Sequence, residues 1–492
     1  MNLSFFREPE LEFGNGGTHV DIRYGMMRHG PLDSGDPTAP TQLKVGVIGT
    51  EETIASIRNW LDRCRTSIAA KQSKLSNLYP PFPGFSEDSP FHSSLIFHDH
   101  WCAPIRQREF DAALTHTQGN ETVREAAALF IDHAKALVEQ GGPMVLICAP
   151  PTELLAAVDD PPGTRPDPLE QELDEGSELA SGERRPLIAF HDVLKAEGLR
   201  LRIPIQMVRP YTYMGGQRPR KSMAKRASST PAQDEATRAW NFHTALYYKA
   251  GGVPWRLLRN PSDLATCFVG ISFYRSIDGD RILTSVAQVF NERGEGVIVK
   301  GAQAQLTKDD RQPHLTEADA DSLLSNAINV YRREHRTSPA RVVVHKTSKM
   351  TDGEIHGFQS ATEKHKIDVV ELLSMRRSFT RLFRAGTYPP LRGTFLRLQK
   401  ATGLLYLRGS VQFFQTYPGM YVPRPLEFFV ARSEATVEQI AKEILSLSKL
   451  NWNNTQFDGG EPITVRAARR VGDILKCVPE GGEVQPSFRY YM

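Results

Sequence analysis

Apolar residues in the first half of the chain alternate between continuous runs and helical spacing. The run over 43–48 predicts a buried strand, and the apolar residues of 53–61 recur with the period of a helix. A second unit joins a predicted helix over 123–140 to a strand over 144–148. Strand, helix, helix and strand at this spacing predict an α/β layer built on a parallel sheet.

Two segments of this half lack such a pattern. Residues 1–40 contain short apolar pieces between glycine-rich turns, which predict a thin arm of strands and loops. Residues 151–185 are proline-rich and acidic, which predicts a surface insertion or linker without a core of its own. The Gly49-Thr50 turn precedes a predicted helix and could bind a phosphate through backbone amides, but it lacks a glycine-rich phosphate-binding motif.

A helix in the middle of the chain ends at a sharply defined stop. Its apolar positions have helical spacing, Gly251-Gly252 supplies a left-handed C-cap, and Pro254 prevents continuation. Lys249 lies in the last turn of this helix. A cation there complements the helix dipole. The same side chain could instead contact a bound anion, and the spacing alone does not decide between the two.

Further polar side chains precede this helix. His191 and Lys195 lie four residues apart on a predicted helix over 186–199, so they share one face. The run over 200–208 predicts a strand with alternating apolar residues, and Gln206 faces the side opposite to them. A solvated polar face explains this pattern, and so does a set of donors for an anion.

The second half predicts strands first and helices between later strands. Adjacent strands are expected within 264–305, followed by a helix over 318–335 with Thr316 as its N-cap. Further strands are expected at 341–345, through Leu405, and at 425–430, with helices over 436–449 and 467–475.

Composition narrows the class of protein only slightly. The 492 residues carry a formal charge of +3, so any nucleic-acid binding must come from local clusters of charge. The five cysteines are widely separated, which argues against a disulfide framework or a structural zinc site. The sequence contains neither an apolar run near the ~20 residues that span a bilayer nor the layout of a signal peptide. We therefore expect a cytoplasmic protein.

Several short motifs resemble Argonaute proteins. The stretch 248–255, Tyr-Lys-Ala-Gly-Gly-Val-Pro-Trp, resembles the junction of their MID and PIWI domains. Segments that resemble PIWI sequences are VGIS (269–272), VVVHKT (342–347), PGMYVPRPLEF (418–428) and LNWNN (450–454). The resemblance covers about residues 41–492 and leaves no room for PAZ and N domains, as in short prokaryotic Argonautes. It implies an arm over 1–40, a Rossmann-like MID domain over 41–252 and an RNase H-like PIWI domain over 253–492.

The resemblance also implies a site for the 5′-phosphate of a guide strand. His191, Lys195, Gln206 and Lys249 match, in order, the residues that form this site in the family. Mg²⁺ at the phosphate would be held by Gln206 and by the terminal carboxylate of Met492, although a frayed terminus remains an alternative. Tyr211 and Tyr213 could stack on a first base. Cations along the strand would be Arg218, Arg220, Lys221, Lys225 and Arg226.

The positions that hold catalytic carboxylates in the family carry other residues. Ser272 and Thr347 replace the first and second Asp, and Arg469 or an immediate neighbour occupies the final position. Cleavage of the RNase H type requires carboxylates that hold two metal ions. Glu292 or Glu295 could fill a further position but cannot hold two metals alone. We therefore expect no cleavage. The alternative is an active guided nuclease with displaced carboxylates, for which Asp278, Asp280 and Asp352 are candidates.

By resemblance, such a protein uses a 5′-phosphorylated small RNA to recognise complementary single-stranded DNA of a plasmid or phage. It forms a heterodimer, which could assemble further on activation, with an APAZ-containing effector. That effector is expected to be a sirtuin-like or TIR protein that degrades NAD, or a nuclease, and to cause abortive infection. Phe5, Phe6 and Phe13 are candidates for docking this partner. A small-ligand α/β enzyme is a third hypothesis.

Overall fold

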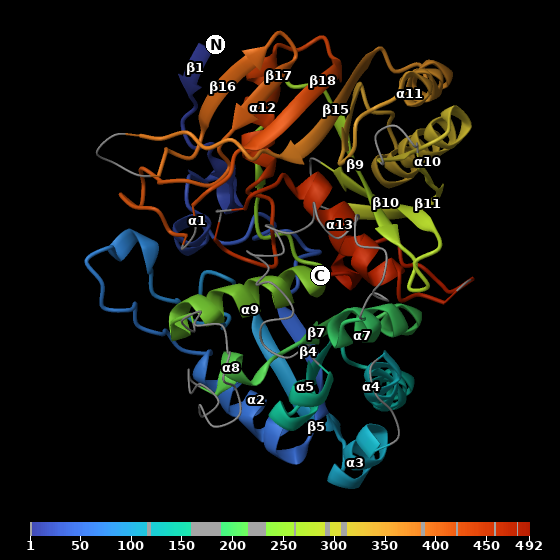
Figure 1. Ribbon diagram of the computed structural model, residues 1–492. Coiled ribbons are helices and arrows are strands. Elements are labelled where there is room, and N and C mark those ends of the chain that lie inside the picture. Colours follow the sequence, from blue (N-terminus) through green and yellow to red (C-terminus); the bar gives the residue numbers. More distant parts are fainter. Residues whose placement is uncertain are drawn as a thin grey trace.

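The computed structural model describes residues 2–492 except 116–119, 159–187, 215–232, 260–261, 291–295, 307–311, 385–388, 420–421, 457–458 and 480. Figure 1 shows two α/β parts, each built on its own sheet, with α9 (Glu235–Lys249) between them. The predicted α/β class is therefore confirmed.

The smaller part is built on a parallel sheet of four strands in the order β5-β4-β6-β7. The strands are β4 (Gln42–Gly49), β5 (Ser94–Pro104), β6 (Val145–Ala149) and β7 (Ile205–Met207). The helices are α2 (Glu51–Arg63), α3 (Gln107–Thr115), α4 (Asn120–Gln140), α5 (Thr152–Val158), α7 (Phe190–Gly198), α8 (Pro210–Tyr213) and α9. Apolar side chains of α2 and α9 pack with one face of the sheet, and those of α4 and α7 with the other. The predicted parallel α/β layer is confirmed.

Three details of this part differ from the sequence predictions. Strand β5 was not predicted, because its apolar pattern is interrupted where the register with β4 shifts between Val45 and Val47. The predicted insertion at 151–185 begins with α5, whose Leu154 and Leu155 are buried in the core, so this portion is no linker; residues 159–185 lie outside the described residues. The predicted strand over 200–208 is shortened to β7, because a 3-10 turn ends at Arg202 with a left-handed φ of 54°.

The larger part is built on a nine-stranded mixed sheet in the order β1-β16-β17-β18-β15-β14-β9-β10-β11. Its strands are β1 (Asn2–Phe5), β9 (Thr266–Arg275), β10 (Ile282–Phe290), β11 (Gly296–Gln303), β14 (Arg341–Lys346), β15 (Val369–Arg377), β16 (Thr394–Gln399), β17 (Thr402–Leu405) and β18 (Leu426–Arg432). A separate ladder joins β12 (Gln305–Leu306) to β13 (Pro313–His314). Strands β9, β14 and β15 are parallel neighbours, so their carboxyl ends lie at one edge.

The helices of the larger part are α10 (Glu317–His335), α11 (Asp352–Lys364), α12 (Val437–Leu447) and α13 (Ile463–Leu475). Thr316 caps α10 as predicted, accepting a hydrogen bond from the amide of Asp319 at 3.0 Å. Helix α11 was not predicted, although Thr351 and Glu354 form a capping box at its start. Helix α13 packs across β9, where the main chain of Thr464 lies so close to Gly270 that no Cβ would fit.

The N-terminal arm joins both parts. Strand β1 pairs with β16 at the edge of the large sheet, and β2 (Leu11–Glu12) pairs with both β3 (Thr18–His19) and β8 (Arg256–Leu257). The arm also forms a helix that was not predicted, α1 (Ile22–His29). Phe6 and Phe13 are buried, so the hypothesis that they dock a partner is wrong, whereas Phe5 is 41% exposed.

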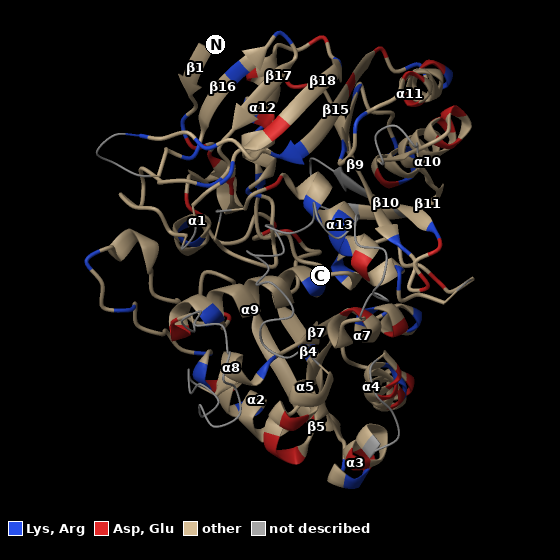
Figure 2. Ribbon diagram, viewed as in Figure 1, with Lys and Arg blue, Asp and Glu red and all other residues tan. Residues whose placement is uncertain are grey.

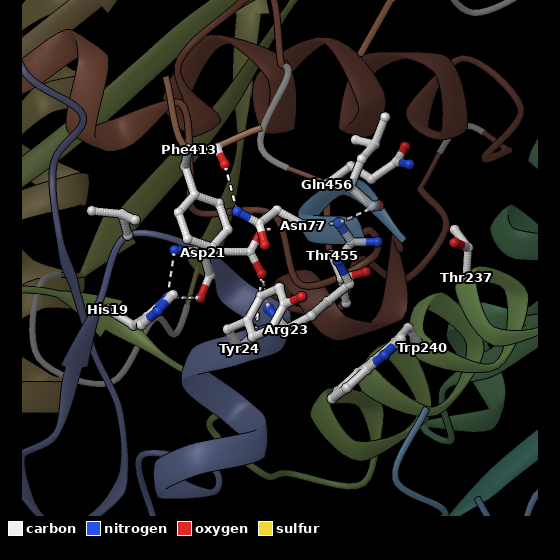
Figure 3. Close-up of polar contacts among 12 residues, drawn as sticks. His19, Asp21, Arg23, Tyr24, Asn77, Thr237, Trp240, Phe413, Thr455 and Gln456 are labelled. Carbon is white, nitrogen blue, oxygen red and sulfur yellow. Dashed lines mark hydrogen bonds and ion pairs between the residues drawn. The ribbon is translucent and has the colours of Figure 1, made fainter. Parts of the chain in front are cut away.

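Figure 3 shows how α1 is held. Asp21 caps the helix by accepting hydrogen bonds from the amides of Arg23 and Tyr24. The ring of Phe413, from a loop of the larger part, packs edge-on against Tyr24, with ring centroids 5.6 Å apart. The side-chain amide of Asn77, from the smaller part, donates to the carbonyl oxygen of Phe413 at 2.9 Å. Three segments far apart in the sequence therefore meet at α1.

A buried group that we call the arm anchor attaches residues 8–9 to the larger part. Nε of Arg392 lies 3.0 Å from both carboxylate oxygens of Glu8, and the ammonium of Lys449 lies 3.4 Å from that carboxylate. Lys449 also donates to the carbonyl oxygens of Pro9 and Val20. The arm anchor, comprising Glu8, Arg392 and Lys449, therefore pairs its two cations with a carboxylate and with main-chain oxygens.

Candidate nucleic-acid interface

The junction after α9 is fixed by hydrogen bonds and by aromatic packing. Gly251 has a φ of 102°, which favours glycine, and the amide of Gly252 donates to the carbonyl oxygen of Tyr247 at 3.0 Å. The ring of Tyr248 stacks on Trp452, with centroids 4.9 Å apart, so the junction contacts the 450–454 segment. The predicted helix and its stop are confirmed, and they place Lys249 at the end of α9.

Lys249 points at the neighbouring strand. Its ammonium donates to the side-chain oxygen of Gln206 on β7, and the residue is only 1% exposed. Burial, reinforced by the nearby charge of Arg470, lowers the pKa of Lys249 to about 7. The side chain therefore does more than complement the helix dipole: it is a buried donor directed at Gln206.

Lys195 reaches the C-terminal residues. Its ammonium donates to the main-chain oxygens of Ile205 and Met492, and the residue is buried. Burial lowers its pKa well below the ordinary value, and the charges of Lys249 and Arg470 add to this effect. The tail beyond the 3-10 turn η4 (Phe488–Tyr490) is buried, not frayed, and Figure 1 shows its end beside α9 and α13.

His191 contacts a residue that the sequence analysis missed. Nη2 of Arg470, on α13, lies 2.6 Å from Nδ1 of His191, and Nη1 of Arg470 lies 3.2 Å from the Asp192 carboxylate. Burial and the charge of Arg470 lower the pKa of His191 to about 3, so the imidazole is neutral. Burial opposes ionisation of Asp192, but Arg470, His191 and Lys476 together outweigh it and lower the pKa of that carboxyl. The signal in the sequence was the Arg469-Arg470 pair, which was considered only for the vacated catalytic position and not for the phosphate-binding residues.

The four predicted phosphate-binding residues thus come together with two others, and we call the group the cation site: His191, Lys195, Gln206, Lys249, Arg470 and Met492. Among the described residues, Lys195 and Lys249 form no ion pair with a side-chain carboxylate. Two ammonium groups and a guanidinium group therefore lie close together with mostly uncharged acceptors. Such a site favours an anion that accepts several hydrogen bonds.

The positions of the expected vacated carboxylates also lie close together. Thr347 directly follows β14, and its amide donates to the carbonyl oxygen of Ile271 at 3.1 Å, which places it beside Ser272 of β9. The hydroxyl of Ser285 donates to the carbonyl oxygens of Ser272 and Ala468. Arg469 follows Ala468 on α13, and its Nη1 lies 3.0 Å from the carboxylate of Glu461.

The acidic candidates for a displaced metal site do not form a cluster in the described part of the chain. Asp278 and Asp280 lie in the turn between β9 and β10, where Asp278 accepts a hydrogen bond from the amide of Asp280, and Asp352 begins α11. No group of three or more His, Cys, Asp or Glu side chains suited to a metal is found among the described residues. Glu292 and Glu295 lie outside the described residues.

Other predicted contacts have mixed outcomes. Tyr213 is buried in the core, so its ring is not accessible to a base, whereas Tyr211 is 55% exposed. Thr50 caps α2 by accepting a hydrogen bond from the amide of Thr53. The basic residues Arg218, Arg220, Lys221, Lys225 and Arg226 lie outside the described residues.

The arrangement of the two sheets is that of the MID and PIWI domains of Argonaute proteins. The structure of Clostridium butyricum Argonaute bound to a guide DNA and a 19-mer target DNA matches 98% of this chain with a TM-score of 0.63 and 16% identity. Drosophila Piwi matches 99% of the chain (TM-score 0.59, 13% identity), and Aa-Ago with externally bound siRNA matches all of it (0.57, 14%).

This chain covers 54%, 56% and 56% of those three chains, and so spans about half their length. The sequence matches no protein-family model and no curated protein. In the described residues, no helix has the length and apolar character needed to cross a membrane.

Proposed function

We propose that this chain binds a guide nucleic acid by its 5′-phosphate and recognises a complementary strand without cleaving it. The observation that carries the proposal is the cation site, where Lys195, Lys249 and Arg470 converge without a side-chain carboxylate on either lysine. A terminal phosphate carries a charge of about −1.5 to −2 and several acceptor oxygens, which suits this set of donors. The similarity to Argonaute structures that contain guide and target strands supports the assignment of the anion.

The proposed guide is a 5′-phosphorylated small RNA and the proposed target is complementary single-stranded DNA. A phosphate would take the place of the present acceptors of Lys195 and Lys249, and Arg470 would reach it from α13. His191 is neutral and would donate one hydrogen bond. Because Arg470 belongs to the larger part and His191 to the smaller, a phosphate held by both would connect the two parts.

Mg²⁺ is the cofactor proposed at this phosphate. It requires oxygen ligands, and Gln206 and the main-chain oxygen of Met492 are of that kind. Each oxygen accepts a hydrogen bond from a lysine here, so the ion would have to replace those donors. Mg²⁺ would neutralise phosphate charge, while the chain's own residues hold and orient the strand end.

The proposed absence of cleavage follows from the replacement of carboxylates by Ser272, Thr347 and Arg469. A guanidinium group at such a site would repel a divalent ion. In this proposal the chain is a sensor, and target recognition activates an APAZ-containing effector that degrades NAD. No contact among the described residues favours the alternative of an active nuclease.

The first test identifies nucleic acid that copurifies with the protein. Wild type and the triple variant His191→Ala/Lys195→Ala/Lys249→Ala are compared by sequencing and end-labelling. Lys74→Ala/Lys400→Ala is the matched control, because it also removes two lysines, both from exposed positions. We expect short 5′-phosphorylated RNA with wild type and control, and its loss from the triple variant. The same heterogeneous nucleic acid in all three samples would refute the site.

Two further measurements address the rest of the proposal. A matched, labelled DNA target with Mg²⁺ or Mn²⁺ should remain intact, and specific cleavage would establish the nuclease alternative. With the APAZ partner present, a complementary target should trigger loss of NAD, whereas a scrambled target should not. An unchanged NAD level with both targets would remove the effector assignment.

A further inference from the structure

The loop that follows β15 exposes two aromatic side chains. We call residues 378–384, Ser-Phe-Thr-Arg-Leu-Phe-Arg, the aromatic loop. Phe379 is 82% exposed and Phe383 is 84% exposed, whereas no other large apolar side chain among the described residues exceeds 64%. Single exposed apolar side chains are common on protein surfaces, but two such rings in one short loop indicate a contact site.

Hydrogen bonds hold the aromatic loop in this form. The amide of Ser378 donates to the carbonyl oxygen of Pro425 at 3.0 Å. The amide of Leu382 donates to the hydroxyl oxygen of Tyr406 at 2.7 Å. Nη1 of Arg381 turns back and donates to main-chain oxygens of the loop at 3.0 and 3.2 Å. The loop is therefore fixed at its first residue and again between its two rings, so the exposed rings are a built feature of the surface.

Positive charge accompanies the rings. The aromatic loop contains two arginines and no acidic residue. The guanidinium carbon of Arg424 lies over the face of the Phe379 ring, 5.5 Å from its centroid. An aromatic face next to a guanidinium group offers a nucleotide both a surface for its base and a partner for its phosphate. Basic residues with interleaved aromatic rings are typical of surfaces that bind single-stranded nucleic acid.

The aromatic loop begins close to the start of α13, the helix that carries Arg470. Nη2 of Arg377, the last residue of β15, lies 3.5 Å from the carboxylate of Glu461, just before α13. Figure 2 shows basic residues at this end of β15 and along α13. From Ile463 to Arg470 the helix rises about 10 Å, at about 1.5 Å per residue. That rise equals about three nucleotides of a strand, at about 3.4 Å each. A strand held at the cation site can therefore reach the loop within its first several nucleotides.

We propose that the aromatic loop binds unpaired bases of a single-stranded nucleic acid, which stack on Phe379 and Phe383. Arg424 holds the phosphate of the nucleotide whose base lies on Phe379. The ligand is recognised by the faces of its bases, which all four bases possess, so the contact tolerates any sequence. This inference rests on the proposed function only in taking a nucleic acid as the ligand, because the aromatic loop shares no residue with the cation site.

The principal experiment measures the affinity of a 5′-phosphorylated RNA single strand for wild type and for Phe379→Leu/Phe383→Leu. Leucine keeps an apolar side chain but removes the aromatic face, so affinity should fall about tenfold or more. The melting temperature should not change, because both rings are exposed. Phe379→Tyr/Phe383→Tyr should bind like wild type, since tyrosine also stacks on bases. So should the matched control Phe5→Leu/Phe429→Leu, which removes two rings that are 41% and 48% exposed on other strands.

Two further measurements isolate the stacking contact. A duplex of the same RNA should bind wild type and Phe379→Leu/Phe383→Leu alike, because its bases already stack on one another. Single abasic sites then locate the contact along the single strand. One abasic site beyond about the third nucleotide from the 5′ end should weaken binding to wild type about fivefold and cause no further loss in the leucine variant.

Several outcomes would overturn the proposal. A folded Phe379→Leu/Phe383→Leu protein with wild-type affinity for the single strand would do so, and so would an equal loss with single strand and duplex. Unchanged RNA affinity with loss of a protein partner would make the loop a protein-docking surface instead. Lys249→Met should remove the preference for a 5′-phosphate over a 5′-hydroxyl and leave the effect of the two rings intact. Binding that depends on the rings but not on the 5′-phosphate would remove only the cation site, whereas failure of wild type to bind RNA would overturn both proposals.

Discussion

The cation site and the arm anchor both bury lysines, yet they differ in what faces them. In the arm anchor, burial lowers the pKa of Lys449 to about 8, and the carboxylate of Glu8 opposes that effect. In the cation site, burial lowers the pKa of Lys249 to about 7, and the neighbouring charge of Arg470 lowers it further. Lys449 is therefore paired with a carboxylate, whereas Lys249 lies near another positive charge, that of Arg470.

This difference separates structural cations from those that await a ligand. Burying a charge costs free energy unless a counter-charge and hydrogen bonds offset it. The arm anchor contains its counter-charge within the chain, so its cations attach the arm. The cation site lacks a side-chain carboxylate on its lysines, so its free energy improves when an anion enters. Two buried lysines that have no side-chain carboxylate as a partner are therefore the physical sign of the site.

The largest expected effect comes from removing the counter-charge of the arm anchor. Glu8→Gln should destabilise the protein by about 3–5 kcal/mol, because Lys449 and Arg392 lose the carboxylate that faces both of them while they remain buried. The measurement is chemical denaturation followed by circular dichroism. Glu427→Gln is the matched control, since its pair with the exposed Arg376 should contribute about 1 kcal/mol or less. An equal loss of stability in Glu8→Gln and Glu427→Gln would show that the arm anchor is no more important than a surface ion pair.

Removing a lysine from the cation site should change ligand affinity and leave stability largely intact. Lys249→Met should leave the stability of the ligand-free protein unchanged or raised, because an apolar side chain replaces an uncompensated buried charge. Affinity for 5′-phosphorylated RNA should fall by about 1.5–3 kcal/mol, as expected for hydrogen bonds to a charged group. Titration calorimetry with phosphorylated and hydroxyl RNA checks both forms. Strong destabilisation with unchanged affinity would make Lys249 structural.

The arm anchor also predicts a dependence on pH. The pKa of Lys449 is about 8 in the folded protein and its ordinary value is 10.5, so the unfolded chain binds more protons between these values. Stability should therefore rise with pH between about 8 and 10.5, by an amount on the order of 1–3 kcal/mol. Lys449→Met should flatten this rise in denaturation measured across the same pH range. An unchanged slope would assign the effect to other groups.

The smallest effect is expected at the partly exposed edge of the cation site. Arg470→Gln should change stability by less than about 1 kcal/mol, because its 37% exposed side chain is screened by solvent. Affinity for the 5′-phosphate should fall only a few-fold, by about 0.5–1.5 kcal/mol. The same calorimetry compares it with Lys249→Met. A loss larger than that of Lys249→Met would make Arg470 the principal ligand.

Local patterns predicted much of the fold. A few neighbouring residues are enough to determine a buried strand or a helix cap. The strand over 43–48, the helix end at Gly251 and the N-cap at Thr316 were all predicted in this way, and all three are confirmed. Strand β5 escaped prediction because polar residues interrupt it at the register shift. The arm was expected to be a thin set of strands and loops, but Phe13 is buried by packing against elements that no local pattern reveals.

The candidate site was predictable only as a set of separate positions. His191 and Lys195 share a helix face by simple spacing, whereas the contact of Lys249 with Gln206 depends on how α9 crosses β7. Arg470 lies 279 residues from His191 in sequence, so only tertiary structure brings it there.

The pairing of β1 with β16 has a consequence for the order in which the parts of the protein fold during synthesis. The four-stranded sheet uses residues 42–207 and can form while the rest is still being synthesised. Asn2 can pair with Arg397 in the sheet only after Arg397 has been synthesised. In the same way, Glu8 can form its ion pairs only after Arg392 and Lys449 have been synthesised. At about 5–20 residues per second, the ribosome leaves the first strand unpaired for roughly 20 to 80 seconds. The arm is thus synthesised before either sheet, yet it is among the last segments to reach its final contacts.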